Sequence, residues 1–344
     1  MTQKLGRIWK NEYFKTAITL ALMILVVFGF FQALKTVLKT EYAMLAVVST
    51  SMLPTLNVGD LIIVQGASAS EVNASYGTGD IVVFKDSSDP NFRIVHRAVK
   101  KEVIDGHYII KTHGDNNSPG EETVEESQLI GKVIARIPYV GNLSLLTQSQ
   151  GNMYLFLLIA IILIVILMIF WNTGSDNETS NGKQKQGRKL FGKLPYSILH
   201  IAVINALLVS FVVFNLWGAF TFWQPGAVPA QYVTARGMSV DLQYHASFKG
   251  SYNNISTTFL SQGLFTYKID STANGIPRSG VLTFSWLQFS ILLLIVYDAW
   301  ESFNFVRSYR SARTETPLDY SEQPSELQSD WMRPADISSR EAFA

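Results

Sequence analysis

The sequence predicts a membrane protein of the α+β class, in which an all-β domain and a small second β module are joined to about four membrane-spanning helices. Only 16% of the 344 residues are charged, against about a quarter in soluble proteins. Four apolar runs are long enough to cross a bilayer. The segment between the first two runs is rich in short β-branched stretches, which are typical of strands.

Charge and cysteine content exclude several classes of function. The 28 basic and 27 acidic residues leave a formal net charge of +1, which argues against nucleic acid as a main partner. The chain contains no cysteine, so disulfides, thiolate catalysis and cysteine-based zinc sites are excluded. The sequence shows no metal-ligand spacing, and we expect no cofactor.

The apolar runs cover residues 16–34, 153–171, 198–223 and 281–300. Each is close to the roughly 20 residues that span about 30 Å of hydrocarbon. The first run could also be read as a cleaved signal peptide. Lysines follow it without a small-residue cleavage site, which favours a retained anchor.

Basic residues indicate the orientation of these runs. They gather in residues 1–15, 183–193 and 307–313, which all lie on one side of the membrane if the four runs span it. Because positive charge favours the cytoplasmic side, we expect residues 35–152 and 224–280 to lie outside. The protein is then a multi-pass membrane protein of the cell membrane or the endoplasmic reticulum.

The apolar runs and the polar segments between them divide the chain into eight expected parts. Residues 173–196 and the last segment are polar and read as flexible. In order, the parts are a cytoplasmic N-terminus with the first span (1–40), the β domain (41–150), the second span (151–172), a cytoplasmic linker (173–196), the third span (197–223), the second β module (224–280), the fourth span (281–302) and a flexible cytoplasmic tail (303–344).

Strands are expected in both β parts. In the second module, residues 238–249 and 265–270 alternate strictly between apolar and polar side chains, which predicts strands with one wet face. His245 falls on that wet face, so we expect it to be exposed. In the first domain, Gly-Asp and Asp-Gly pairs separate short β-branched runs. These runs are 45–48, 61–64, 81–84, 93–95, 108–110 and 133–135.

Three polar residues of the first domain form a candidate catalytic set. Ser51 precedes Pro54, whose fixed φ makes a rigid turn that could present the hydroxyl. His96 lies in a predicted strand, and Asp115 lies in a Gly-Asp-Asn-Asn turn. Taken singly, each also fits a structural role in a turn or at the edge of the core. Together they supply a nucleophile, a base and an acid that orients the base.

These segments resemble the type I signal peptidases, in the archaeal and endoplasmic-reticulum-type branch of that family. Residues 51–55 match the nucleophile box and residues 79–84 match the strand after it. Residues 94–97 match the box in which bacterial relatives carry a lysine base, and His96 stands at that position here. Residues 114–117 match the acidic box. The resemblance covers residues from about 15 to 145.

The resemblance implies a membrane-bound serine endopeptidase that removes signal peptides from exported preproteins and cuts after small residues at positions −1 and −3. Ser51 would be the nucleophile, His96 the general base and Asp115 the acid that orients the base. Ser49 would donate to the oxyanion. The branch carries a second Asp further along the acidic box, and Glu121 occupies that position here. The implied partners are signal peptides, the lipid bilayer and the protein-export machinery.

Two other classes of protein remain open from the residues alone. One is a non-enzymatic, membrane-anchored surface or interaction module in which Ser51 and His96 are structural. The other is a self-cleaving regulator with a similar serine-centred β fold, although the Ser–Lys chemistry and the DNA-binding context of such proteins are missing. The second module lies outside the resemblance and could serve as a platform for substrate or partners.

Overall fold

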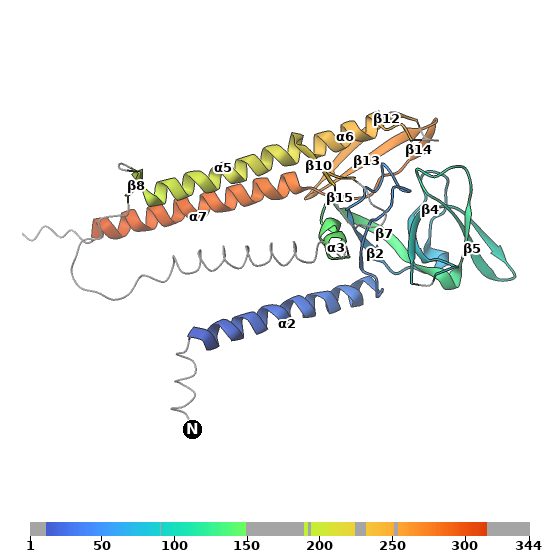
Figure 1. The fold of residues 1–344 in the computed structure, drawn as a ribbon, viewed down its shortest axis with the longest axis horizontal. Coiled ribbons are helices and arrows are strands. Elements are labelled where there is room, and N and C mark those ends of the chain that lie inside the picture. Colours follow the sequence, from blue (N-terminus) through green and yellow to red (C-terminus); the bar gives the residue numbers. More distant parts are fainter. Residues whose placement is uncertain are drawn as a thin grey trace, which may run out of the picture. The chain divides into compact units, whose positions relative to one another are not determined.

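The computed structural model describes residues 12–89, 91–148, 189–191, 194–223, 232–250 and 254–314 (Figure 1). The chain divides into two units, Met1–Leu294 and Ile295–Ala344. The sheet and the candidate site both lie in the first unit. The predicted second span at 151–172 lies outside the described residues, as does most of the linker at 173–196.

Three helices of the described residues are candidate membrane spans. They are α2 (Glu12–Leu38), α5 (Tyr196–Trp217) and α7 (Trp286–Thr314). They coincide with three of the four predicted runs, and the described residues do not establish the fourth. The helix α5 ends earlier than predicted because Ala219–Trp223 forms strand β10, paired with β11 (Tyr232–Arg236). The helix α7 continues to Thr314, so the prediction of a flexible tail was wrong for residues 303–314.

One sheet of 11 strands contains most of the β structure, in the order β12-β13-β15-β7-β3-β4-β5-β6, with β1 and β14 paired to β2 and β13, and β2 also paired to β7. All six runs predicted for residues 41–150 overlap strands, and β6 was not predicted. This part is not purely β, because helix α3 (Gly141–Gln148) follows β7. The strands from the first part of the chain are β1 (Met44–Ala46), β2 (Leu61–Gln65), β3 (Ile81–Lys85), β4 (Arg93–Ile104), β5 (His107–His113), β6 (Glu122–Glu125) and β7 (Leu129–Ile137).

Four of the strands after α5 join this same sheet, so they do not form the separate second module that we predicted, whereas β10 and β11 form a two-stranded sheet of their own. The four are β12 (Ile255–Gly263), β13 (Thr266–Ala273), β14 (Ile276–Arg278) and β15 (Thr283–Phe284). The join is a short parallel pairing of β15 with β7 at Thr283 and Arg136. A backbone hydrogen bond of 2.8 Å from Arg136 N–H to Leu282 O extends it.

Residues 238–247 form a helix, α6 (Met238–Ser247), where the alternating pattern had predicted a strand. Its buried side chains are Met238, Asp241 and His245, which follow the spacing of one helix face. Two of the three are polar, so hydrophobicity did not reveal the helical period. His245 is 3% exposed, and the prediction of a solvent-facing position was wrong.

A buried cluster of charges explains why polar residues face inward on α6. Arg136 on β7 donates to Asp60 at 3.0 Å, to Asp241 at 2.6 Å and to the Thr283 hydroxyl at 2.8 Å. The Tyr267 hydroxyl donates to the same Asp241 oxygen at 3.1 Å. A buried guanidinium requires such partners, because an unpaired buried charge is costly. The cluster therefore fastens α6 and β13 to the first part of the sheet.

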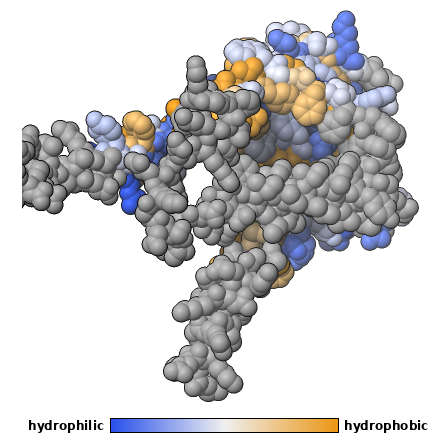
Figure 2. Space-filling view, turned by 60° about the vertical axis from the view of Figure 1, so that its left-hand side comes forward, coloured by the Kyte–Doolittle hydropathy of each residue, from blue (hydrophilic) through white to orange (hydrophobic). Residues whose placement is uncertain are grey.

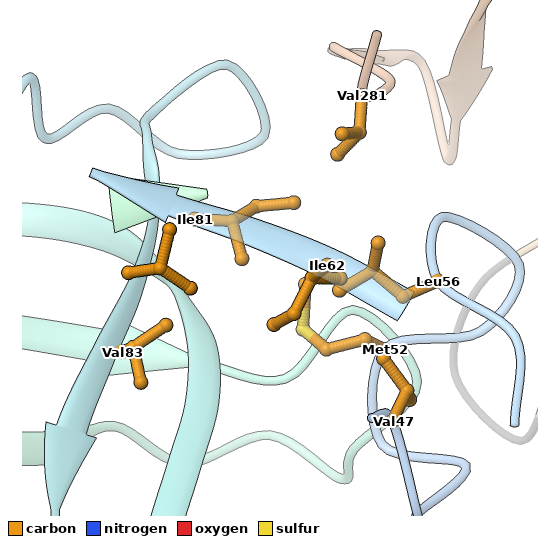
Figure 3. Close-up of a cluster of buried hydrophobic side chains, with 8 residues drawn as sticks. Val47, Met52, Leu56, Ile62, Ile81, Val83 and Val281 are labelled. Carbon is orange, nitrogen blue, oxygen red and sulfur yellow. The ribbon is translucent and has the colours of Figure 1, made fainter. Parts of the chain in front are cut away.

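The hydrophobic core also combines both parts of the chain (Figure 3). Val281, from the loop between β14 and β15, packs in the same cluster as Met52, the neighbour of Ser51. Full burial of a side chain of this size stabilises the fold by about 1.5–3 kcal/mol. The buried members of the cluster are Val47, Met52, Leu56, Ile62, Val64, Ile81, Val83 and Val281.

We predict that His245 makes the fold sensitive to acid. Burial lowers the pKa of His245 to about 4 from the usual 6.5, although Asp241 opposes the shift and Arg136, Arg236 and Arg278 add to it. A lowered histidine pKa contributes stability that is complete above about pH 6.5 and is lost as the pH falls toward 4. Between pH 7.5 and 4.5 the loss is about 3 kcal/mol.

The measurement is urea unfolding of the detergent-solubilised chain at these two pH values. His245→Gln removes the titrating group, so its unfolding free energy should fall by about 3 kcal/mol less than that of the unsubstituted chain. An equal fall in both chains contradicts the prediction.

Candidate active site

Ser51 lies in the loop between β1 and β2, directly beside the hydrophobic core. Met52 and Leu56 are 2% and 0% exposed, and the Leu56 N–H donates to Met52 O at 2.9 Å. These two buried side chains lie on either side of Pro54 and hold the turn that the sequence predicted. The Ser51 hydroxyl is half-buried, and its oxygen lies 3.1 Å from Ser49 Oγ.

His96 lies on β4 and is buried, with both ring nitrogens occupied. Its Nδ1 is 2.9 Å from a carboxylate oxygen of Glu122, and its Nε2 is 3.4 Å from the amide nitrogen of Asn117. A carboxylate can only accept and an amide NH2 can only donate, so these partners assign the proton to Nδ1. Nε2 then carries the lone pair that a general base requires, and in this structure that lone pair accepts a long hydrogen bond from Asn117.

The loop at residues 114–117 contacts both Ser51 and His96. Asn116 N–H donates to Ser51 O at 2.7 Å, and the neighbouring Asn117 is the residue beside His96 Nε2. A Cβ at Gly114 would lie 2.9 Å from Ser51 O, so glycine allows this close approach. Among the described residues no hydrogen bond joins the Ser51 hydroxyl to His96. Such bonds are often long in free enzymes and shorten when substrate binds.

Asp115 is buried, but its carboxylate does not contact His96. Arg97 donates to both of its oxygens at 2.8 Å, and the Thr55 hydroxyl donates to one of them at 2.5 Å. Burial alone would raise the pKa of Asp115, and the Arg97 guanidinium outweighs this effect and lowers it. The expectation that Asp115 orients the imidazole directly therefore differs from the geometry, in which Asp115 is the counterion of an arginine.

Glu122, which we had not chosen from the sequence, is the acidic partner of His96. We had named its neighbour Glu121 as the second acid. The strand β6 begins at Glu122, and alternation places Glu122 on the same face as the fully buried Val124. That alternation was readable in the sequence, so the position of the acid could have been predicted once the strand was recognised. The Glu122 side chain is 51% exposed and that of His96 7% exposed.

Arg278 brings the distant part of the chain to the acidic loop. From β14, its Nη2 donates to Asp115 O at 3.2 Å, and its Nε lies 3.9 Å from the Asp115 carboxylate. Arg97 in turn donates to Ser279 O at 2.9 Å. Burial lowers the pKa of Arg278, and Asp115 opposes that shift. No local sequence signal identifies these contacts, because the partners lie far apart in the sequence. Arg278 follows Asp115 by 163 residues.

In the parts of the chain that the structure describes, no group of three or more His, Asp or Glu side chains is arranged to hold a metal ion.

Comparison with known proteins identifies the domain that carries this site. A model of the family described as signal peptidase, peptidase S26, matches residues 12–111. The part of the chain that carries Ser51 and His96 is thus similar to the signal peptidases. The match to the S26 model includes Ser51 and His96 and ends just before the acidic loop.

Three similar proteins bear the name signal peptidase complex catalytic subunit. The one from Dictyostelium discoideum, sec11, is 29% identical over 136 residues, which are 37% of this chain and 73% of that protein. SEC11 from Verticillium alfalfae is 28% identical over 36% of this chain and 74% of its own length. SEC11 from Metarhizium acridum is 28% identical over 38% of this chain and 78% of its own length.

We predict that Glu122 and Glu121 differ sharply when each is changed to glutamine. Glu122→Gln removes the charge that holds the protonated Nδ1 of His96, so the rate of preprotein cleavage should fall at least tenfold. The loss should be smaller than the roughly 10⁴-fold seen when a buried orienting carboxylate is replaced, because water reaches Glu122. Glu121→Gln is the matched control and should retain nearly full activity. The reverse ranking of the two variants rejects the assignment.

We predict that Asp115 is required mainly for folding. Asp115→Asn leaves two buried guanidinium groups without their counterion, which should cost about 3–5 kcal/mol of unfolding free energy. Adding Arg278→Met removes the surplus cation and should recover part of this loss. Asp80→Asn is the control, because Asp80 pairs with Lys132 at 3.3 Å near the surface and should cost less than about 1 kcal/mol. Equal losses for Asp115→Asn and Asp80→Asn in urea unfolding contradict the prediction.

Proposed function

We propose that this chain is a signal peptidase that hydrolyses preproteins through an acyl-enzyme on Ser51, with His96 as general base and Glu122 as the acid that orients His96. One observation supports this most directly. The carboxylate on Nδ1 fixes the tautomer in which His96 Nε2 can accept a proton, and Asn117 beside Nε2 belongs to the loop that holds Ser51.

The proposed reaction follows from these positions. His96 Nε2 takes the Ser51 proton as the hydroxyl oxygen attacks the scissile carbonyl, and it returns the proton to the leaving amine. The imidazolium that forms in between is stabilised by the Glu122 carboxylate at 2.9 Å from Nδ1. Water then attacks the acyl-enzyme by the same route, which releases the signal peptide and regenerates the hydroxyl of Ser51.

Ser49 is the proposed side-chain donor to the oxyanion. Its hydroxyl oxygen lies 3.1 Å from Ser51 Oγ, so it stands next to the atom that would attack. The backbone N–H of Ser51 is the proposed second donor. Donors of this kind stabilise a transition state by about 2.7–4 kcal/mol each.

Strand β1 offers a place for the substrate. Among the described strands it pairs with β2 alone, and the chain leads from it directly to Ser51. An extended peptide can pair with the edge of a strand, and alternate side chains then point toward the same face. We propose that two shallow contacts on that face select small residues at positions −1 and −3.

The end of α2 supports a position of the site near the bilayer. Gly66 N–H, just after β2, donates to Leu38 O at the last residue of α2, at 2.8 Å. We propose that α2, α5, α7 and the apolar run at residues 153–171 cross the membrane, with the sheet on the extracytoplasmic side. The basic residues before α2, at 183–193 and at Arg307 and Arg310 then all fit the cytoplasmic side. A signal peptide is cleaved at this same level.

We propose that partners include other proteins of preprotein export. The similar proteins named above are subunits of a signal peptidase complex. The exposed apolar surfaces of α2 and α5 are available to lipids and to further membrane helices.

We predict that Ser51→Ala abolishes preprotein cleavage, whereas Ser49→Ala lowers the rate by about 10²- to 10³-fold. The measurement is cleavage of a preprotein by the full chain in membranes. Ser70→Ala, a surface serine on η1 (Ala69–Glu71), is the matched control and should cleave normally. Cleavage at the normal rate by Ser51→Ala overturns the catalytic assignment. It would favour the alternative, a membrane-anchored interaction module in which Ser51 is structural.

A further inference from the structure

An unusual turn joins β12 to β13. Gly263 pairs with Thr266, so the loop consists of two apolar residues, Leu264 and Phe265. Phe265 has a φ of +56°, a left-handed conformation that is unfavourable for a bulky side chain. The Leu264 side chain is 84% exposed, the largest value for any large hydrophobic side chain in the described part of the chain.

The same sheet contains two ordinary turns of this length. Asp105–Gly106 joins β4 to β5, and Asn274–Gly275 joins β13 to β14. All four of these residues have positive φ values, and Asn-Gly and Asp-Gly are the preferred pairs for such turns. The turn before β13 thus lacks the residues preferred for two-residue turns, whereas the turn after β13 has them. Departures of this kind are expected where function requires them.

The Leu-Phe turn is held against the first turn of α7. Gln288 Nε2 donates to Gly263 O at 2.9 Å, and Ser285 N–H donates to Phe265 O at 2.9 Å. The candidate membrane span of α7 begins at Trp286. Leu264 therefore lies at the level where α7 would enter the bilayer, and β13 carries the chain away from that level (Figure 1).

The end of α5 is found at the same level. Asn215 donates to Trp286 O at 3.5 Å, and the Phe211 and Trp286 rings lie 6.4 Å apart. Two large side chains follow in the chain and are exposed, Trp217 at 62% and Phe220 at 49%. Aromatic side chains of this kind are enriched at the membrane–water interface.

The sequence segments that carry these residues are uncharged. The sequence has no Asp, Glu, Lys or Arg in residues 194–235, 250–267 or 279–297. Hydrophobic residues also gather together on the face drawn in Figure 2, with hydrophilic residues toward its margin. An exposed apolar tip without neighbouring charge can enter the interfacial layer of a bilayer at little electrostatic cost.

We propose that the Leu264–Phe265 turn inserts into the lipid–water interface beside α5 and α7, together with Trp217 and Phe220. The occupant of this surface is lipid, because the surface is continuous with the ends of two candidate spans. The insertion gives the sheet an additional attachment to the bilayer, besides the one at the end of α2. The proposal requires that α7 crosses the membrane, and it does not depend on the catalytic assignment.

Spin labels test the proposal directly, since the chain has no native cysteine. Leu264→Cys and the matched control Ile276→Cys place labels at the two ends of β13, and Ile276 is 39% exposed. The full chain is labelled with a nitroxide and reconstituted into phosphatidylcholine vesicles. Electron paramagnetic resonance then measures collision of each label with oxygen, which concentrates in lipid, and with a water-soluble nickel chelate.

We expect the label at 264 to favour oxygen over the nickel chelate severalfold relative to the label at 276. Equal ratios at the two positions overturn the proposal, because the turn would then lie in water. Protection of position 264 from both reagents also overturns it, since a protein surface would then cover the turn. If Leu264→Cys does not fold, Phe220→Cys carries the same expectation and the same control.

Discussion

The buried ion pair between Arg97 and Asp115 is the interaction on which the site depends. Both carboxylate oxygens of Asp115 accept from Arg97, and the backbone beside Asp115 is the loop that holds Ser51 O and faces His96 Nε2. A buried pair of this kind contributes little net stability compared with apolar side chains, but breaking it is costly. Its value here is geometric, because it gives the 114–117 loop one position relative to β4, the strand that carries both Arg97 and His96.

The second half of the chain completes this arrangement. Arg278 donates to Asp115 O, Ser279 O accepts from Arg97, and Val281 packs in the core cluster with Met52. The similar proteins named above match less than two fifths of this chain. These contacts thus come from β14 and the loop that follows it, outside the family model, and β15 joins this part of the chain to β7.

The sequence predicted those features that depend on residues close together in the chain. The β-branched runs form strands, and the serine and histidine boxes supplied Ser51 and His96, which we propose as nucleophile and base. The helix α6 was missed because its inward face is polar, and polar residues are buried there only because Arg136 needs Asp241. The contact made by Arg278 was also missed, because its partner Asp115 lies far away in the sequence. Glu122 was within reach, since it differs from Glu121 only in strand parity.

Asp115 and Glu122 have different partners. Asp115 pairs with Arg97 and fixes the loop, whereas Glu122 contacts His96, and one carboxylate could not do both. The Asp115 oxygens already accept three hydrogen bonds at 2.5–2.8 Å from Arg97 and Thr55, and this cationic partner lowers its pKa. A carboxylate whose charge is neutralised in this way offers little to a developing imidazolium. Glu122 instead lies 2.9 Å from His96 Nδ1, with a side chain that is 51% exposed. Water also weakens the attraction between them, because the field of an exposed charge is screened. The site thus combines a buried acid, paired with an arginine, that fixes the loop with a half-exposed acid that contacts the histidine.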